Sequence, residues 1–218
     1  MYEVAPNVYL LRGMPDYLVN VYLVGDVLID AGTRMAAPGL LRQLKGRKLS
    51  LHALTHVHPD HQGATKTICE TFSVPLVCAA SEAAAMESGD MRSQIPRSVV
   101  TQLQDVFWTG AGYPVDRGLV EGDQVGGFTV IETPGHSPGH LAYWRESDRT
   151  LIAGDVARNI NFTTLKTELG EPPALFTLDP AQNRASLRKL AELRPRTVLF
   201  GHGRPLLDGA AFVEFAAG

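Results

Sequence analysis

The chain has 218 residues, enough for one large domain with a sizeable core or two small domains. Apolar residues make up 44% of it and charged residues 20%, which is ordinary globular usage. The formal net charge is −3, and no basic stripe interrupts the mixed charges, so a nucleic-acid backbone is not expected as a partner.

The chain begins MYEVAPNVYLLRG, without the basic segment and apolar core of a signal peptide. No apolar run reaches the roughly 18–20 residues of a transmembrane helix. Cys69 and Cys78 lie outside CxxC and CxH spacings, so we expect reduced thiols in the core. These features predict a cytoplasmic protein that does not bind membranes and acts on a small molecule.

The first half of the chain alternates between predicted strands and helices. Residues 1–30 are rich in Val, Leu, Ile and Tyr, with a VGDV turn typical of a hairpin. Residues 35–46 predict a helix ending at Gly46, and residues 49–55 predict a short buried strand. A helix is then expected over 60–72, followed by a strand over 74–79.

The second half contains two segments without clear periodicity, 83–118 and 157–178, which we interpret as possible lids over a site or as surface excursions. Strands are predicted at 128–135, 140–147, 150–155 and 197–203, and a short helix ends the chain. A helix over 179–193 has Asp179 as its N-cap and Pro180 at its first position. This order predicts one domain over 1–218 with two mixed sheets packed together and helices outside, rather than a doubly wound parallel sheet.

The stretch HVHPDH places four potential metal ligands within six positions. His56 and His58 are two residues apart and project to the same side of extended backbone, which Pro59 favours at His58. Asp60 and His61 follow at the start of the next predicted helix. Imidazole and carboxylate groups suit Zn²⁺, so the motif indicates a metal site rather than a set of solvated loop histidines.

Three further ligand-type residues follow the ends of other predicted strands. His136 follows a strand in a Pro/Gly turn, Asp155 follows LIAG, and His202 follows VLFG. Strand ends are where a rigid scaffold presents site residues. With HVHPDH they make five histidines and two aspartates, too many for one four-coordinate ion and suitable for two ions that share a carboxylate.

The motifs THVHPDHQG, TPGHSPGH, AGD and FGHG, in this order, resemble those of the metallo-β-lactamase-fold hydrolases, and the glyoxalase II-like branch in particular. The resemblance covers nearly the whole chain. It implies an α+β fold, a four-layer αβ/βα sandwich of two mixed β-sheets flanked by helices, with the site along one edge.

By position, the resemblance implies that one metal is bound by His56, His58 and His136, the other by Asp60, His61 and His202, and that Asp155 bridges them with a water or hydroxide. Asp30 matches a family aspartate that supports the ligands from behind. A turn aspartate after a strand would look the same. His140 reads as a supporting or structural residue, and His52 as a strand histidine rather than a ligand.

The resemblance implies a hydrolase that uses two divalent ions, with zinc expected first and iron or manganese also suited to these ligands. A bridging hydroxide would attack the carbonyl of a thioester, ester or lactone. Asp60 would be a ligand that also orients the nucleophile or carries a proton to the leaving group. Alternatives are β-lactam amide hydrolysis and a mononuclear-iron, persulfide dioxygenase-like oxidoreductase.

Some features depart from individual branches of the resembled family. Exported β-lactamases lack an aspartate at the position of Asp155, and few residues follow His202 to form the helical region of glyoxalase II. Arg158 stands where lactonases carry a tyrosine; it is a candidate to pair with a substrate carboxylate or phosphate, or a surface arginine. The residues expected to line the substrate pocket come from the two irregular segments: Trp108, Tyr113, Arg158, Asn161 and Phe162.

Overall fold

Two β-sheets form the centre of the protein in a computed structural model that describes all residues from 1 to 218. The seven-stranded sheet has the order β1 (Tyr2–Ala5), β2 (Val8–Leu11), β3 (Val21–Val24), β4 (Val27–Ile29), β5 (Leu51–Ala53), β6 (Leu76–Ala79), β7 (Arg117–Leu119). The five-stranded sheet has the order β14 (Thr197–Phe200), β11 (Thr150–Gly154), β10 (Leu141–Arg145), β9 (Phe128–Glu132), β8 (Gln124–Val125). A separate ribbon pairs β12 (Arg158–Asn159) with β13 (Leu169–Gly170).

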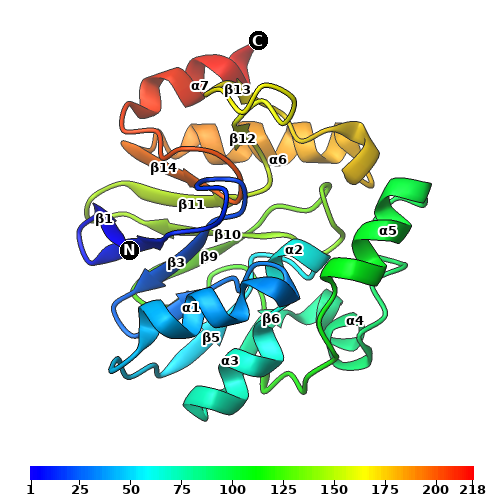
Figure 1. Cartoon of the computed structure of the whole chain (residues 1–218). Coiled ribbons are helices and arrows are strands. Elements are labelled where there is room, and N and C mark those ends of the chain that lie inside the picture. Colours follow the sequence, from blue (N-terminus) through cyan, green and yellow to red (C-terminus); the bar gives the residue numbers. More distant parts are fainter.

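Helices cover the outer faces of both sheets, which gives the four layers visible in Figure 1. No helix is long and apolar enough to cross a membrane. The α-helices are α1 (Ala37–Leu44), α2 (Pro59–Gln62), α3 (Thr65–Phe72), α4 (Ala83–Ser88), α5 (Val99–Trp108), α6 (Pro180–Glu192) and α7 (Gly209–Ala217). Short 3₁₀ turns are η1 (Arg34–Ala36), η2 (Ala80–Glu82) and η3 (Ala174–Phe176).

The strands are apolar on both faces because each sheet lies between two layers. In β3, Tyr22 and Val24 belong to the cluster between the sheets, whereas Val21 and Leu23 pack under α1 and α3. In β10, Tyr143 faces the other sheet and its neighbours face α6 and α7. The two-residue period of a strand sends alternate side chains to these two cores. The predicted four-layer sandwich is therefore confirmed.

Local signals produce most of the predicted elements. Gly25 has a positive φ of 60° in the β3–β4 hairpin, which matches the predicted VGDV turn. Asp179 caps α6 by accepting from the backbone N–H of Gln182, and Pro180 begins the helix as predicted. The helix predicted over 60–72 is instead two helices, α2 and α3, with Gly63 between them.

The segment 83–118 is more regular than predicted, because it contains the ten-residue helix α5. A capping box between Ser98 and Thr101 starts this helix. Sequence periodicity missed α5 because its apolar residues do not form a stripe facing the core. They are largely exposed: Val99, Val100, Leu103, Val106 and Phe107.

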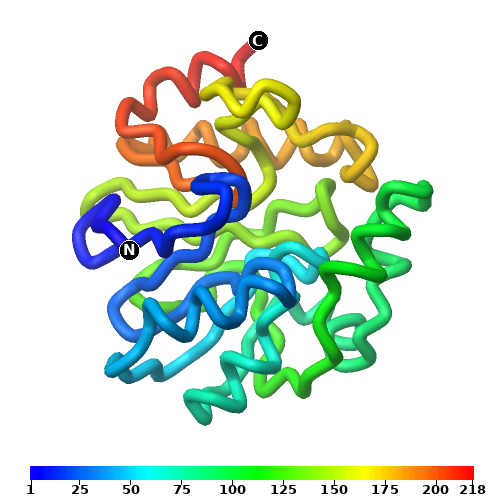
Figure 2. Tube along the Cα trace, viewed as in Figure 1, coloured from blue at the N-terminus to red at the C-terminus, as the bar shows by residue number.

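The topology brings the ends of several strands to one edge of the sandwich. Strands β4 to β7 run parallel to one another, as do β11 and β14. Figure 2 shows the N-terminal segment in blue beside the segment after β14 in orange. Asn20 holds them together, because its side-chain amide donates to the carbonyls of Phe200 and Gly203. The segments that follow β5, β11 and β14 meet at this edge.

His52 is buried inside β5, and both of its ring nitrogens have partners. Nδ1 lies 3.0 Å from the carbonyl oxygen of Leu28, and Nε2 lies 3.0 Å from the hydroxyl of Thr65. Burial lowers the pKa of His52 to about 4, despite the opposing effects of the Leu28 carbonyl and Asp30. The side chain is a neutral core histidine and no ligand.

Replacing His52 with Gln should reduce the acid sensitivity of the fold. As the pH falls below 6.5, the unfolded chain protonates His52 before the folded protein does, so stability is lost between 6.5 and about 4. At pH 5 this loss is about 2 kcal/mol. We expect the drop in unfolding free energy between pH 7 and pH 5, measured by urea denaturation, to be smaller in His52→Gln by about that amount. Equal drops in both proteins would contradict a neutral buried His52.

Candidate metal centre

Three histidines from both sheets converge on one point at the strand edge. His56 and His58 follow β5, and His136 lies in the turn between β9 and β10. One ring nitrogen of each lies within 4.8 Å of the corresponding atoms of the other two. Ring centroids of His56 and His58 are 4.4 Å apart, and those of His58 and His136 are 4.5 Å apart. We call these residues the three-histidine group.

Each ring in the three-histidine group is held through its outer nitrogen. Such contacts fix the tautomer and the ring orientation and leave the inner nitrogen free. The contacts are His56 Nδ1 with the Thr55 hydroxyl at 3.0 Å, His58 Nε2 with the Gln94 carbonyl at 2.7 Å, and His136 Nδ1 with the Thr177 hydroxyl at 3.2 Å. The free nitrogens are therefore Nε2 of His56 and His136 and Nδ1 of His58.

A second group of ligand-type side chains lies beside the first and consists of Asp60, His61 and His202. Asp60 Oδ2 lies 3.3 Å from His202 Nε2 and 3.9 Å from His61 Nε2. The outer nitrogen of His202 contacts the carbonyl oxygen of Leu18. We call these residues the aspartate–histidine group.

Asp155 lies between the two groups. Its Oδ2 atom is 3.0 Å from His202 Nε2 and 3.5 Å from Nε2 of both His61 and His136. The close packing depends on Gly201, since a Cβ atom there would lie 1.9 Å from Asp155 Oδ1. One carboxylate is thus in reach of ligand atoms from both groups.

Asp30 supports both groups from behind. Its Oδ2 atom accepts from His61 Nδ1 at 2.9 Å and from the Thr55 hydroxyl at 2.9 Å, and Thr55 in turn contacts His56. The backbone of Asp30 is left-handed, with φ of 62°, a conformation that Asp and Asn tolerate better than most residues. The structure therefore gives Asp30 contacts that a simple turn aspartate would lack.

His140 does not point a free nitrogen into either group. Its Nε2 accepts from the backbone N–H of Asp155 at 2.9 Å, and its Nδ1 lies 2.8 Å from the Thr133 hydroxyl. Both ring nitrogens are engaged, so His140 positions the start of the Asp155 segment.

The two groups differ in their electrostatics. Burial, reinforced by neighbouring imidazoles, holds the pKa values of His56 and His136 well below the ordinary value. Burial opposes a charge on His202, but the Asp155 and Asp60 carboxylates together outweigh it and raise the His202 pKa to about 10. Burial would raise the pKa of Asp155, yet His202 and His61 hold it well below its usual range.

The donor set fits divalent metal ions. Buried polar atoms in folded proteins are nearly always hydrogen-bonded, and unpaired ones cost free energy. Three buried ring nitrogens aimed into the cluster have no hydrogen-bond partner, and ions among them would satisfy all three: His56 Nε2, His61 Nε2 and His136 Nε2. Imidazole nitrogens and carboxylate oxygens are ligands of zinc, iron and manganese alike.

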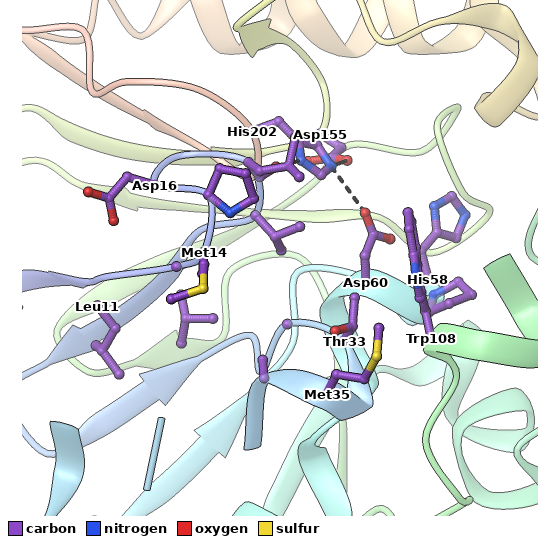
Figure 3. Close-up of a pocket in the computed structure, with 18 of the residues that line it drawn as sticks. Leu11, Met14, Asp16, Thr33, Met35, His58, Asp60, Trp108, Asp155 and His202 are labelled. Atoms are coloured by element: carbon purple, nitrogen blue, oxygen red, sulfur yellow. Dashed lines mark hydrogen bonds and ion pairs between the residues drawn. The ribbon is translucent and has the colours of Figure 1, made fainter. Parts of the chain in front are cut away.

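A cavity of about 1200 Å³ opens over the cluster, as Figure 3 shows. His58, Asp60 and His202 line one part of it, and Leu11 and Met14 line another. Among the residues predicted to bind substrate, Trp108, Arg158 and Phe162 line this cavity.

Two predicted pocket residues do not line the cavity. Tyr113 packs instead against the buried cluster beneath α3 and α4. The Asn161 amide is used locally, donating to Glu168 and accepting from two backbone N–H groups of its own turn. Sequence placed both in loops near the site, but only tertiary packing decides which way a loop side chain points.

Arg158 reaches the cavity with its guanidinium already engaged. It donates to the carbonyl oxygens of Glu171 and Ile160 and pairs with Glu168 at 3.4 Å. These contacts tie the β12–β13 ribbon together, so most of its donors serve the fold.

Sequence reasoning missed several residues that shape the site. Gln94 contributes a backbone carbonyl, which carries no side-chain signal. Thr177 and Glu82 are ordinary residues in the sequence and become relevant only through distant contacts. Met14 and Met35, which are 98% and 66% exposed at the cavity, also have no motif.

The chain belongs to the metallo-beta-lactamase superfamily, whose family model matches residues 14–202. It is 31% identical to the probable metallo-hydrolase YflN of Bacillus subtilis, over 94% of this chain and 87% of that protein. It is 28% identical to a hydroxyacylglutathione hydrolase of Bdellovibrio bacteriovorus, over 80% of this chain but 60% of that protein. Membership of a superfamily of metal-binding hydrolases agrees with the cluster.

Solved structures give the same assignment. The B3 metallo-beta-lactamase BLEG-1 superposes with a TM-score of 0.70 at 27% identity, covering 91% of this chain and 93% of that one. TTHA1623 in a di-iron-bound form superposes with a TM-score of 0.62 at 27% identity, covering 93% and 91%. The protein is a metallo-hydrolase of this superfamily with a small-molecule substrate.

Replacing Asp30 with Asn should weaken metal binding. Asn suits the left-handed backbone, but whichever way its amide is turned, the NH₂ group faces either the Thr55 backbone N–H or the His61 Nδ1–H, and neither can accept. Loss of such a supporting contact typically lowers metal affinity by about 10- to 100-fold. Competition with a chromophoric chelator measures this, and Asp26→Asn in the exposed hairpin is the control. Unchanged affinity in Asp30→Asn would reject the supporting role.

Proposed function

We propose that the protein is a dinuclear metal-dependent hydrolase that cleaves a thioester, ester or lactone carbonyl. The observation that carries this proposal is the position of Asp155, whose carboxylate lies within 3.5 Å of ligand nitrogens from both groups. The three-histidine group would hold one ion, the aspartate–histidine group the other, and Asp155 both. The di-iron form of TTHA1623 supports two ions, and zinc, iron or manganese would suit the ligands.

Two ions held there would supply an activated water as nucleophile and a Lewis acid for the substrate carbonyl. The chain's own residues would orient the reaction. Asp60 Oδ2 faces the cavity and contacts His202, where it can direct the nucleophile and carry its proton to the leaving group. Asp30 and His140 would keep His61 and Asp155 in place.

The cavity favours a substrate with an apolar acyl part. Met14, Met35 and Phe162 present exposed apolar surface to it, and Trp108 adds an aromatic wall. Arg158 has most of its donors engaged. Buried apolar surface stabilises a ligand without needing polar partners. We therefore favour a substrate whose acyl group is apolar.

Two other activities are the alternatives, and one observation bears on each. The likeness to BLEG-1, described as a B3 metallo-beta-lactamase, keeps β-lactam amide hydrolysis under test. A mononuclear-iron, persulfide dioxygenase-like reaction would use the three-histidine side and Asp155 alone. The unpaired His61 Nε2 atom disfavours the mononuclear-iron reaction, since a single ion on the three-histidine side would leave that buried nitrogen without a partner.

Purified protein should contain about two divalent ions per chain. Asp155→Ala should lower that number and reduce hydrolysis of a thioester, lactone and β-lactam panel to background, because both ions lose a ligand. Metal analysis and steady-state kinetics measure these effects, and Glu192→Ala on α6 is the control. A single iron with oxygen uptake would reject the hydrolase, and full activity of Asp155→Ala would reject the shared carboxylate.

Hydrolysis of acyl thioesters should improve as the acyl chain lengthens. Each buried CH₂ contributes about 0.8 kcal/mol, so kcat/KM should rise by roughly tenfold or more from acetyl to octanoyl. Met35→Gln should reduce the ratio of kcat/KM for the octanoyl thioester to that for the acetyl thioester, because it places an amide on the cavity wall. The matched control is Leu207→Gln, which is exposed but outside the cavity. A ratio near one in the wild type would rule out the apolar acyl group.

A further inference from the structure

Glu82 is a fully buried carboxylate with no role in the two ligand groups. It ends η2, directly after β6, and its side chain is 0% exposed. A buried carboxylate is costly unless hydrogen bonds compensate it. The hydrogen-bond partners of Glu82 therefore indicate what this buried carboxylate does in the structure.

All three donors to Glu82 come from the two segments that carry the three-histidine group. Oε2 accepts from the backbone N–H of Val57, the residue between His56 and His58, at 2.9 Å. Oε1 accepts from the Ser137 hydroxyl at 2.5 Å and from the backbone N–H of Gly139 at 2.9 Å. One side chain thus joins a loop of the large sheet to a turn of the small sheet.

The turn also packs directly on Glu82. A Cβ atom at Gly139 would lie 2.6 Å from Glu82 Cγ and 2.3 Å from the Ser81 hydroxyl. Two other hydrogen bonds join the same segments, from Leu141 N–H to the Thr55 carbonyl and from the Tyr143 hydroxyl to the Leu54 carbonyl. Both acceptor carbonyls precede His56 in the chain. After His56, the two segments are joined by the hydrogen bonds of Glu82.

We propose that Glu82 is a positioning residue that sets the spacing of the three-histidine group by holding both of its ligand-bearing segments at once. The proposal rests on the assignment of this group as a metal site. His136 comes from one sheet and its two partners, His56 and His58, from the other, so their separation depends on contacts across the sheets. The aspartate–histidine group has no hydrogen bond to Glu82 and should not depend on it.

Glu82→Gln is the sharpest variant because it keeps the shape and changes one acceptor into a donor. Whichever way the amide is turned, its NH₂ group faces either the Val57 N–H or the Gly139 N–H, and neither can accept. One segment must then move away. Ser137→Ala is a milder second variant, since it removes one donor and leaves the carboxylate in place.

Zinc affinity should be measured by chelator competition in two backgrounds that each retain one group. His202→Ala leaves the three-histidine group, and His136→Ala leaves the aspartate–histidine group. In the first background, Glu82→Gln should weaken binding by about tenfold or more, and Ser137→Ala by a smaller factor. In the second, neither change should alter affinity. The absorption spectrum of bound Co²⁺ in the first background should also change, which reports ligand geometry rather than stability.

Asp116→Asn is the matched control, because the Asp116 carboxylate accepts from the backbone N–H of Leu76 at the start of β6. It should leave both affinities and the Co²⁺ spectrum unchanged. Equal losses in both backgrounds, or no loss with Glu82→Gln and Ser137→Ala, would overturn the proposal. If Glu82→Gln does not fold, Ser137→Ala decides alone. Absence of metal binding by the wild type would reject the proposed function itself.

Discussion

The face-to-face packing of the two sheets is the constraint on which the rest of the structure depends. Neither sheet supplies a complete ligand group, because His56, His58, Asp60 and His61 follow strands of the large sheet. The other ligand-type residues, His136, Asp155 and His202, follow strands of the small sheet. The apolar cluster between the sheets joins β3 to β10 and holds these edges together. The core therefore serves the site directly, since its register decides whether the ligand-type atoms meet.

Burial of the imidazoles and carboxylates of the site is stable because each one is held by a hydrogen-bond partner. Outer ring nitrogens are held by hydroxyls, carbonyls or the Asp30 carboxylate, and Asp155 is set by the N–H bond to His140. The ring nitrogens of His56, His61 and His136 that remain unpaired point to the centre of the cluster. This arrangement separates two tasks, because the outer contacts fix geometry while the inner atoms stay available to an ion.

The site and the cavity above it are built from different parts of the fold. Ligand-type residues lie at strand ends and on the short helix α2, where the backbone is held by the sheets. The cavity walls come from less regular segments, including the N-terminal loop with Met14, helix α5 with Trp108, and the turn with Phe162. Side chains that such segments present to the cavity can change without moving the strand ends that carry the cluster, so one superfamily can combine a common centre with different substrates.

The sequence by itself determined the class of fold and the positions of the chemistry. Alternating apolar residues, the Asp179 cap and the HVHPDH spacing are local signals that act through nearest neighbours, so they can be read without a structure. Only the tertiary structure decided that α5 forms within a segment lacking a core-facing stripe. It also decided which loop side chains enter the cavity and that Glu82 joins two distant segments. Those features depend on contacts between residues far apart in the chain, and the packing of one sheet on the other creates them.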